Sequence, residues 1–374
     1  MAAFAVRVSD SSQRAAFAPR AGFHVPSLDG LRAVSFLIVF AAHAGAELVP
    51  GGFGVTVFFF LSGYLITTLL RLEGEKTGHY SLRHFYLRRL LRIWPPFYIV
   101  LLGAVALRQS GFLRADTALE SHAVASQLLH FSNYWIATHG WGGVAVGTGV
   151  YWSLAVEEHF YLAFPALFIL LDRRGWLGTQ KAFVFWGLCA LVLAWRCFLV
   201  FGWKTPTDRT YLCSDTRIDS ILFGCALAVW NNPRLDPAGR SPLQSQAVVR
   251  TLAVLGFGVL LVSFAVRGAA FRESVRYTLQ GAALTPLFVA AIRWPRALVF
   301  QPLNWKPMQF IGTLSYTLYL VHQVVLAAFA QHTSLAPFSR ASAALFASLA
   351  IAWAMYQWVE KPCAKLRRRL SATD

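Results

Sequence analysis

Long apolar runs, separated by short polar or basic stretches, repeat along almost the whole chain. Each run holds about 17 to 22 residues, which is the length an α-helix needs to cross the hydrocarbon core of a bilayer. The pattern therefore predicts an all-α integral membrane protein, built as a bundle of ten transmembrane helices. The predicted spans cover residues 31–48, 52–70, 94–109, 152–171, 182–200, 215–231, 251–267, 277–293, 309–331 and 341–358.

Basic residues between these runs predict the orientation. With the N-terminus inside, 23 of the 34 Lys and Arg residues fall in cytoplasmic segments and eight in external ones. This bias places both termini in the cytoplasm. The apolar stretch near 118–137 would reverse every later helix if it crossed the membrane, so we predict an external interfacial or re-entrant segment there.

The same pattern divides the chain into three parts. Residues 1–27 contain three arginines and no apolar core, so we expect a flexible cytoplasmic segment. Residues 28–362 form the predicted transmembrane domain, and residues 363–374 form a basic cytoplasmic tail. A multi-pass bundle with basic inner loops is expected in the cytoplasmic (inner) membrane.

Composition excludes several classes of protein. Hydrophobic residues make up 56% of the chain and charged residues 14%, and the mean hydropathy of +0.50 is too high for a soluble domain of this length. The net charge of +17 is spread between the spans, so membrane lipids and not nucleic acid are the expected partners. The five cysteines show no metal-ligand spacing, and no metal is expected.

Arg32 and His43 both lie in the first predicted span. Eleven helical steps of 100° bring His43 back almost under Arg32, about 16 Å along the helix axis. Ionisable side chains inside hydrocarbon need a cavity or a partner. The spacing favours a slot with a cation at its cytoplasmic mouth and an imidazole deeper in, although an interhelical hydrogen bond would also account for the histidine.

Arginines gather in YSLRHFYLRRLLRIWPPF, after the second span. Arg89 and Arg92 lie one helical turn apart, and Arg88 flanks them. Membrane topology and an amphipathic helix on anionic lipid would explain these charges. Two guanidinium groups at this spacing could instead bind the phosphates of a cytosolic ligand such as coenzyme A.

Later spans carry further polar side chains. Glu157 and Glu158 are adjacent in VYWSLAVEEHFYLAFP, so at most one is expected to face a site squarely. The other would stabilise the N-terminal end of its helix through the helix dipole. In the sixth span, one expects an ion pair that neutralises the charges of Asp215, Arg217 and Asp219. In the ninth, Tyr319 and His322 share one face, with His322 at a depth similar to that of His43.

Taken together and in order, these motifs resemble those of membrane acyltransferase family 3, bacterial enzymes that O-acylate carbohydrates and some small molecules. The likeness runs from Leu28 to Pro362 and includes LDGLRAVSFLIVFAAH, GGFGVTVFFFLSGYLIT, FYLRRLLRIWPPF, WSLAVEEHFYLAFP, TRIDSILFGCALA, SYTLYLVHQ and VEKP. Some members carry an additional SGNH-type hydrolase domain. The sequence stops at Asp374, so we expect none here, and the chain would act alone or with a separate periplasmic acyl-transfer partner.

The resemblance implies a membrane-bound O-acyltransferase that moves an acyl group, most simply acetyl, from cytoplasmic acyl-CoA to a carbohydrate hydroxyl of the cell envelope. The family's Arg-x10-His motif matches Arg32 and His43, and its RxxR motif matches Arg89 and Arg92. The latter pair, with Arg88, would bind the phosphates of acyl-CoA while Arg32 guides the donor. His43 would act as a general base or carry the acyl group transiently.

Glu158 is expected to orient His43 or the acceptor. The acceptor is expected to be a carbohydrate, and lipid-linked carbohydrates are included. The acceptor side is expected to be lined by Trp152, Glu157, Tyr319 and His322. A transporter or flippase that uses the intramembrane Arg, His and Asp residues as a translocation path is the main alternative. A lipid-binding scaffold is another, but it leaves His43 unexplained.

Overall fold

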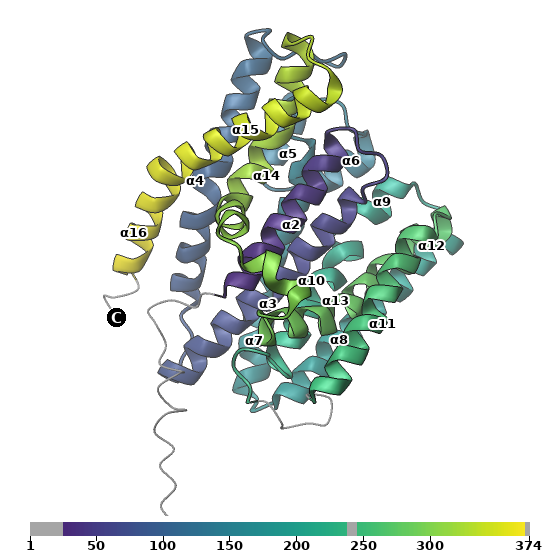
Figure 1. The fold of residues 1–374 in the computed structure, drawn as a ribbon, viewed down its shortest axis with the longest axis vertical. Helices are drawn as coiled ribbons and strands as arrows, with labels where there is room; N and C mark the ends of the chain where they lie inside the picture. The colour runs from purple at the N-terminus through teal and green to yellow at the C-terminus, as the bar shows by residue number, and fades with distance from the viewer. Residues whose placement is uncertain (1–24, 238–244, 371–374) are drawn as a thin grey trace, which may run out of the picture.

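The computed structural model describes residues 25–237 and 245–370, and every regular element in these ranges is helical (Figure 1). The first half contains α2 (Pro26–His43), α3 (Gly51–Thr77), α4 (Leu82–Gln109), α5 (Ser121–Leu128), α6 (Ser132–His139), η2 (Gly149–Tyr151), α7 (Trp152–Arg173), α8 (Gly178–Cys197) and η3 (Phe198–Gly202). The second half contains α9 (Thr207–Leu212), α10 (Ser214–Val229), α11 (Gln246–Ala265), α12 (Ala269–Glu273), α13 (Arg276–Arg293), η5 (Leu298–Asn304), α14 (Lys306–His332), α15 (Pro337–Met355), η6 (Tyr356–Glu360) and α16 (Lys361–Leu370).

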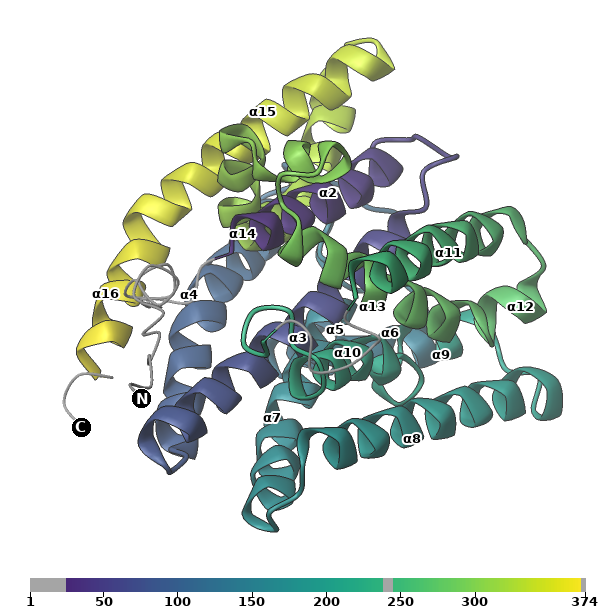
Figure 2. The same ribbon diagram turned by 60° about the horizontal axis from the view of Figure 1, so that its bottom comes forward.

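The buried centre of the bundle is the contact between α3 and α10. Two glycines allow it, because a Cβ atom on Gly63 would lie 2.0 Å from the carbonyl oxygen of Ile221, and one on Gly224 would lie 2.1 Å from that of Phe60. Small residues at such crossings let helix backbones approach closely inside a membrane. Helices α2, α7, α8, α9 and α13 pack against this pair, which lies at the centre of the bundle (Figure 2).

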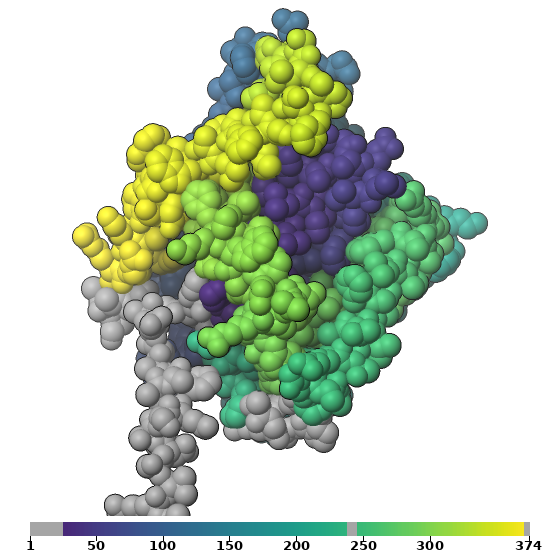
Figure 3. All heavy atoms as spheres, in the orientation of Figure 1, coloured from purple at the N-terminus to yellow at the C-terminus, as the bar shows by residue number. Residues whose placement is uncertain are grey.

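A second close crossing joins α2 to α14. A Cβ atom on Gly312 would lie 1.9 Å from the carbonyl oxygen of Asp29, so only glycine fits at that point. Farther along the same two helices, His43 of α2 meets His322 of α14. The space-filling view shows the segments of α2, α14 and η5 side by side on one face, with α15 and α16 along its edge (Figure 3). The crossing thus fixes how the two histidines meet.

Each of the ten predicted spans coincides with a helix. Fewer than ten of these helices, however, are long and apolar enough to cross a membrane. Seven helical segments of the described chain are long and apolar enough to cross a membrane, and an eighth is counted if α13 and η5, bent by 77°, form one span. The two remaining helices are α2, which carries Asp29 and Arg32, and α10, which has only 16 residues. Ten crossings and their orientation stay predictions.

The segment near 118–137 forms two short helices, α5 and α6, of eight residues each, and neither could cross a bilayer. Helices run past both predicted ends of the transmembrane domain, whose boundaries stay a prediction. Pro26 and Ser27 already belong to α2, and residues 363–370 belong to α16, which packs on α4. The rest of the predicted flexible segment, residues 1–24, and residues 371–374 of the predicted tail lie outside the described residues.

The predicted ion pair within the sixth span is wrong. Asp219 binds Arg196 of α8 through two hydrogen bonds, 2.9 Å from Nη1 to Oδ1 and 2.8 Å from Nη2 to Oδ2, and both side chains are fully buried. Asp215 instead accepts from Arg209, with Nη1 at 3.0 Å from Oδ1. Both aspartates are therefore paired with arginines outside α10.

Arg217 is also fully buried, but its hydrogen bonds go to neutral oxygens. Its Nη1 donates to the carbonyl of Tyr211 at 3.0 Å, and its Nη2 lies 3.2 Å from the hydroxyl of Thr56. Four aromatic rings surround the guanidinium carbon at 3.9 to 5.6 Å from their centres, those of Tyr277, Tyr211, Phe59 and Trp152. Cation–π contacts thus offset part of the cost of burying this charge.

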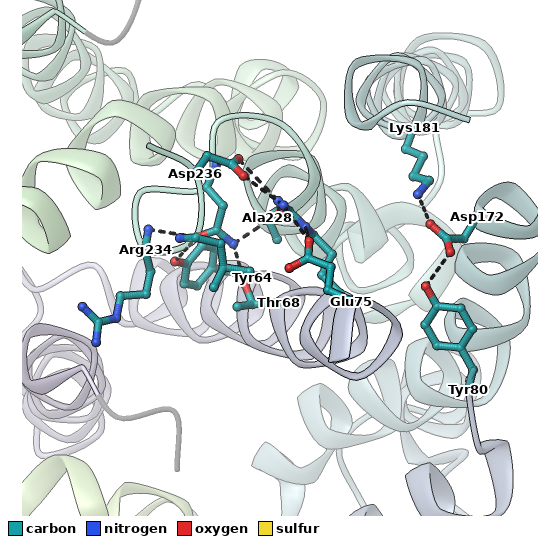
Figure 4. Close-up of polar contacts among 12 residues, drawn as sticks. Tyr64, Thr68, Glu75, Tyr80, Asp172, Lys181, Ala228, Arg234 and Asp236 are labelled. Carbon is teal, nitrogen blue, oxygen red and sulfur yellow. Dashed lines mark hydrogen bonds and ion pairs between the residues drawn. The ribbon is translucent and has the colours of Figure 1, made fainter. Parts of the chain in front are cut away.

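Another charged network ties α3 and the α3–α4 turn to α7, α8 and the segment after α10 (Figure 4). Arg71 donates to Asp236 at 2.9 Å, Lys181 pairs with Asp172, and the Tyr80 hydroxyl donates to Asp172 at 2.6 Å. These residues line a cavity of about 660 Å³. Since their charges are paired with one another, we assign the network to holding helix ends together.

Candidate functional site

A cavity of about 230 Å³ lies among α2, α3, α4, α7 and α14, and it contains most of the residues that the sequence singled out. Three arginines line one end, hereafter the arginine end: Arg32, Arg89 and Arg92. Tyr319 and Ser153 line the opposite end, hereafter the histidine end, because Tyr319 contacts His322 beyond it. The cavity thus runs from a cationic mouth to the neighbourhood of an imidazole.

Two helices supply the arginine end. The Ser81 hydroxyl accepts from the backbone N–H of His84 and caps α4, whose first turns carry the arginines. Arg89 lies with its guanidinium carbon 5.4 Å above the ring centre of Tyr161, and Arg92 is exposed. Arg32 of α2 binds Asp29 at 2.6 Å, so one acid already holds it in place.

Arg88, the third arginine of the predicted phosphate clamp, does not line this cavity. Its Nη2 binds Glu73 of α3 at 2.6 Å. It nevertheless lies on the same helix and at the same end of the molecule as Arg89 and Arg92. The structure therefore brings together three of the four arginines that the sequence proposed for donor binding, with Arg88 beside them.

Both glutamates of α7 line the middle of the cavity, although the helical period led us to expect only one there. Glu157 accepts a hydrogen bond from the Ser62 hydroxyl, and the Tyr161 hydroxyl donates to the same Ser62 oxygen at 3.2 Å. One carboxyl oxygen of Glu158, Oε1, is buried without a hydrogen-bond partner among the described residues. That oxygen is available to a hydroxyl or amide of a bound ligand.

The two histidines form a pair across α2 and α14. His43 Nδ1 lies 2.9 Å from His322 Nε2, and their rings stack with centres 5.1 Å apart. His322 is fully buried, whereas His43, the last residue of α2, is exposed. The chain turns directly after it, at Gly45 with a φ of 100°, which favours glycine.

Hydrogen-bond partners determine which nitrogen of each ring carries a proton. His322 Nδ1 lies 2.8 Å from the carbonyl oxygen of Tyr319, which can only accept, so this nitrogen is the donor. In a neutral His322, Nε2 must then accept, and His43 Nδ1 donates to it. The remaining nitrogen, His43 Nε2, keeps its lone pair and is free to act as a base or a nucleophile.

The structure separates several residues that the sequence grouped together. His43 and His322 do not line the cavity; Tyr319 lies between them and it, with its ring centre 5.6 Å from that of His322. The hydroxyl of Tyr319 is held by Ser153 at 2.8 Å. Glu158 lies in the cavity and not against His43, whose Nδ1 has a histidine partner instead of the expected carboxylate.

Trp152 is buried against Arg217 and lies outside the cavity. Sequence reasoning placed His322 on the acceptor side and missed it as the partner of His43. The similar depth of the two histidines in their spans could have indicated that they are partners. It also missed Ser62 and Ser153, for which the sequence held no signal, because both depend on contacts between separate helices.

The fold and the cavity together define a polytopic helical membrane protein with cations at one end of an internal cavity and an imidazole pair beyond the other. Comparison with known proteins gives the family: residues 25–357 match the family described as an acyltransferase domain, and the chain belongs to it. No solved structure matches the chain.

Three curated relatives illustrate the likeness. The peptidoglycan O-acetyltransferase OatA of Listeria monocytogenes is 34% identical over 319 residues, which cover 81% of this chain and 49% of that protein. A putative O-acetyltransferase of Staphylococcus aureus is 29% identical, with 81% and 51% covered. A putative peptidoglycan O-acetyltransferase of Bacillus subtilis is 28% identical, with 91% and 55% covered. The chain spans about half the length of these relatives.

Proposed function

We propose that this protein is a membrane O-acetyltransferase that moves an acetyl group from acyl-CoA to a carbohydrate hydroxyl of the cell envelope. The observation that carries the proposal is the arrangement of one cavity, with three arginines at one end and Tyr319 at the other, against His322. A polyanionic donor and a neutral base would meet along that line. The names of the relatives support acetyl as the group and peptidoglycan as the first acceptor to test.

The donor would bind at the arginine end. Arg89 and Arg92 would bind its diphosphate, because guanidinium groups pair bidentately with phosphate. Arg32, already oriented by Asp29, would neutralise the charge at the entrance to the cavity. Ten residues of α2 separate Arg32 from His43, and the two lie about 16 Å apart along the helix axis. The extended pantetheine arm would span that distance, and the Tyr319 side chain, which separates the cavity from the histidines, would move aside to let the thioester reach His43.

The reactive atom would be His43 Nε2. As a general base, it would take the proton from the acceptor hydroxyl while the oxygen forms a bond to the thioester carbon. The carbon–sulfur bond would then break, and the imidazolium would return its proton to the leaving thiolate. As a nucleophile, Nε2 would instead form the bond to the acyl carbon, the carbon–sulfur bond would break to release the thiolate, and the Nδ1 proton would pass to His322 Nε2. The acceptor oxygen would then form its bond to the acyl carbon as the bond to Nε2 breaks, the proton would return from His322 to His43 Nδ1, and the hydroxyl proton would go to the thiolate. Since His43 is exposed, an acceptor could approach it without entering the cavity.

The test compares membrane vesicles that hold wild-type protein, His43→Ala or His79→Ala at matched expression. Vesicles would receive acetyl-CoA labelled in the acetyl group, together with peptidoglycan fragments. His79 is a matched control, because it is an exposed histidine in the turn between α3 and α4, away from the cavity. Free CoA thiol and alkali-labile label in the glycan are the two measurements.

The proposal expects both signals from wild-type and His79→Ala vesicles, and a loss of at least a hundredfold in His43→Ala. Label that stays on the wild-type protein when the acceptor is withheld would select the covalent route. Equal signals from all three proteins would remove His43 from the chemistry. Wild-type vesicles that release no CoA but carry solute across the membrane would favour the transporter alternative.

A further inference from the structure

We propose that Ser153 is a positioning residue, which holds the side chain of Tyr319 across the histidine end of the cavity and so controls when the donor thioester reaches His43. This inference rests on the proposed function. The cavity ends at Tyr319, and neither His43 nor His322 belongs to its lining. The ring of Tyr319 lies between the cavity and the histidines, with its centre 5.6 Å from that of His322. Access to the histidines from the cavity therefore depends on the position of this side chain.

The hydroxyl of Tyr319 is held at two points. It lies 2.8 Å from the hydroxyl of Ser153 and 3.1 Å from the carbonyl oxygen of Val150, and the Ser153 hydroxyl lies 3.2 Å from the same carbonyl. A carbonyl can only accept, so one hydroxyl donates to Val150 and the other hydroxyl donates to the first. Both side chains are buried. The ring of Tyr319 is thus fixed at its polar end as well as by packing.

The backbone around this contact is fixed independently of it. The Tyr151 hydroxyl donates to the carbonyl oxygen of Leu320 at 3.0 Å and joins η2 to α14. A Cβ atom on Gly147 would lie 2.4 Å from the backbone nitrogen of Val324, so the loop before η2 also packs directly on α14. Both ties would survive the loss of the hydroxyl contact. Breaking that contact therefore frees the side chain of Tyr319 and leaves the surrounding backbone in place.

The walls beside Tyr319 are apolar. Phe58 of α3 lines the cavity, and its ring meets that of Tyr319 edge-on, with centres 6.0 Å apart. Val55 and Phe59 of the same helix and Leu154 of α7 also belong to the lining. Such walls suit an acyl group and offer water no hydrogen-bonding side chain. While Tyr319 is held, a thioester in the cavity would therefore stay in apolar surroundings.

Water is what this arrangement would keep from the thioester. His43 is exposed, so water can reach its Nε2 atom. A thioester presented there without an acceptor would be hydrolysed: the water oxygen bonds to the acyl carbon, the carbon–sulfur bond breaks, and a water proton passes through Nε2 to the thiolate. The products are acetic acid and CoA thiol. By holding Tyr319 between the thioester and His43, Ser153 would limit this loss.

The experiment uses the purified full chain in liposomes and acetyl-CoA labelled in the acetyl group. Labelled acetate is measured without an acceptor, and labelled glycan is measured with peptidoglycan fragments present. Wild type is compared with Ser153→Ala, Tyr319→Phe and the double variant. Ser348→Ala is the matched control, because this buried serine of α15 also donates to a carbonyl about one turn earlier and does not line the cavity. The Kd of CoA, measured by calorimetry, shows which variants are folded.

We expect Ser153→Ala to raise acetate release without acceptor about fivefold, because one neutral hydrogen bond shifts an equilibrium by about that factor. Tyr319→Phe should raise it at least as much. Adding Ser153→Ala to Tyr319→Phe should have no further effect, since the two hydroxyls act through one contact. Ser348→Ala should match wild type. Each increase should vanish when His43→Ala is added, and the Kd of CoA should not change.

A merely structural role of Ser153 would lower acetate release and glycan labelling together at an unchanged Kd of CoA, and that result would overturn the inference. So would unchanged acetate release in Ser153→Ala, effects that add in the double variant, or an increase that survives His43→Ala. A Ser153→Ala protein that no longer binds CoA is misfolded, and Tyr319→Phe, which removes only an oxygen atom, then decides. Wild-type protein that neither labels the glycan nor releases acetate would overturn the proposed function itself.

Discussion

Replacing His322 with phenylalanine tests the assignment of the reactive nitrogen. The change keeps a ring of similar size but removes the Nε2 acceptor that lies 2.9 Å from His43 Nδ1. A neutral hydrogen bond contributes about 1 kcal/mol, which sets the preference for the productive tautomer at about fivefold. When His43 takes up a proton, the same bond becomes charge-assisted and contributes about 1.5 to 3 kcal/mol. We therefore expect kcat to fall about 10- to 100-fold.

The KM for acyl-CoA should not change, since His322 lies outside the cavity that would bind the donor. The assay is acetyl transfer by purified protein in liposomes, over a range of acyl-CoA concentrations. His322→Gln should recover part of kcat, because its amide oxygen can accept from His43. His332→Phe is the matched control: this residue is exposed at the far end of the same helix. A wild-type kcat in His322→Phe, or a change in KM alone, would refute the reasoning.

Three further predictions concern stability and packing. Arg196→Met should lower the free energy of unfolding by about 3 to 5 kcal/mol by stranding buried Asp219, and adding Asp219→Leu should restore most of it, as measured by thermal midpoints in detergent. Gly312→Ala should cost about 1 to 3 kcal/mol and reduce activity, because its Cβ would lie 1.9 Å from a carbonyl oxygen of α2. Gly103→Ala, in the interior of α4 with open space around it, should instead stabilise the protein by up to about 1 kcal/mol. Burial lowers the pKa of His130, in the turn between α5 and α6, from 6.5 to about 4. Protonation then favours the unfolded state, so stability should fall by about 2 to 3 kcal/mol as the pH drops from 7 to 4.5, and His130→Gln should lack that loss.

Hydropathy predicted where helices occur because burial in lipid imposes one constraint on every span, a run of apolar residues of fixed length. The fourth span illustrates the precision, with 152–171 predicted and α7 found at Trp152–Arg173. The first span shows the limit, since 31–48 was predicted and α2 ends at His43. The apolar residues continue past that point, and a turn at Gly45, not a change in hydropathy, ends the helix.

The ion pairs of α10 show what local sequence can and cannot predict. Residues two positions apart on a helix point about 200° apart, so neither Asp215 nor Asp219 can face Arg217. The helical period alone excludes the pairing that their proximity suggested. The partners that replace it, Arg196 and Arg209, come from other segments, and their choice depends on how α8 and α9 pack against α10. Such contacts leave no mark in spacing along the chain.

The geometry of the histidine pair depends both on local sequence and on tertiary packing. Within α14, His322 Nδ1 bonds the carbonyl of Tyr319 three residues earlier, so the helix itself fixes the protonated nitrogen and leaves Nε2 as an acceptor. Which residue donates to Nε2 is decided by tertiary packing, because the crossing at Gly312 sets α2 against α14 and brings His43 within 2.9 Å. The local bond and the helix crossing must therefore both be present for His43 Nε2 to keep its lone pair. A change at Gly312, ten residues before His322 on the same helix, would therefore act on the same nitrogen as a change at His322.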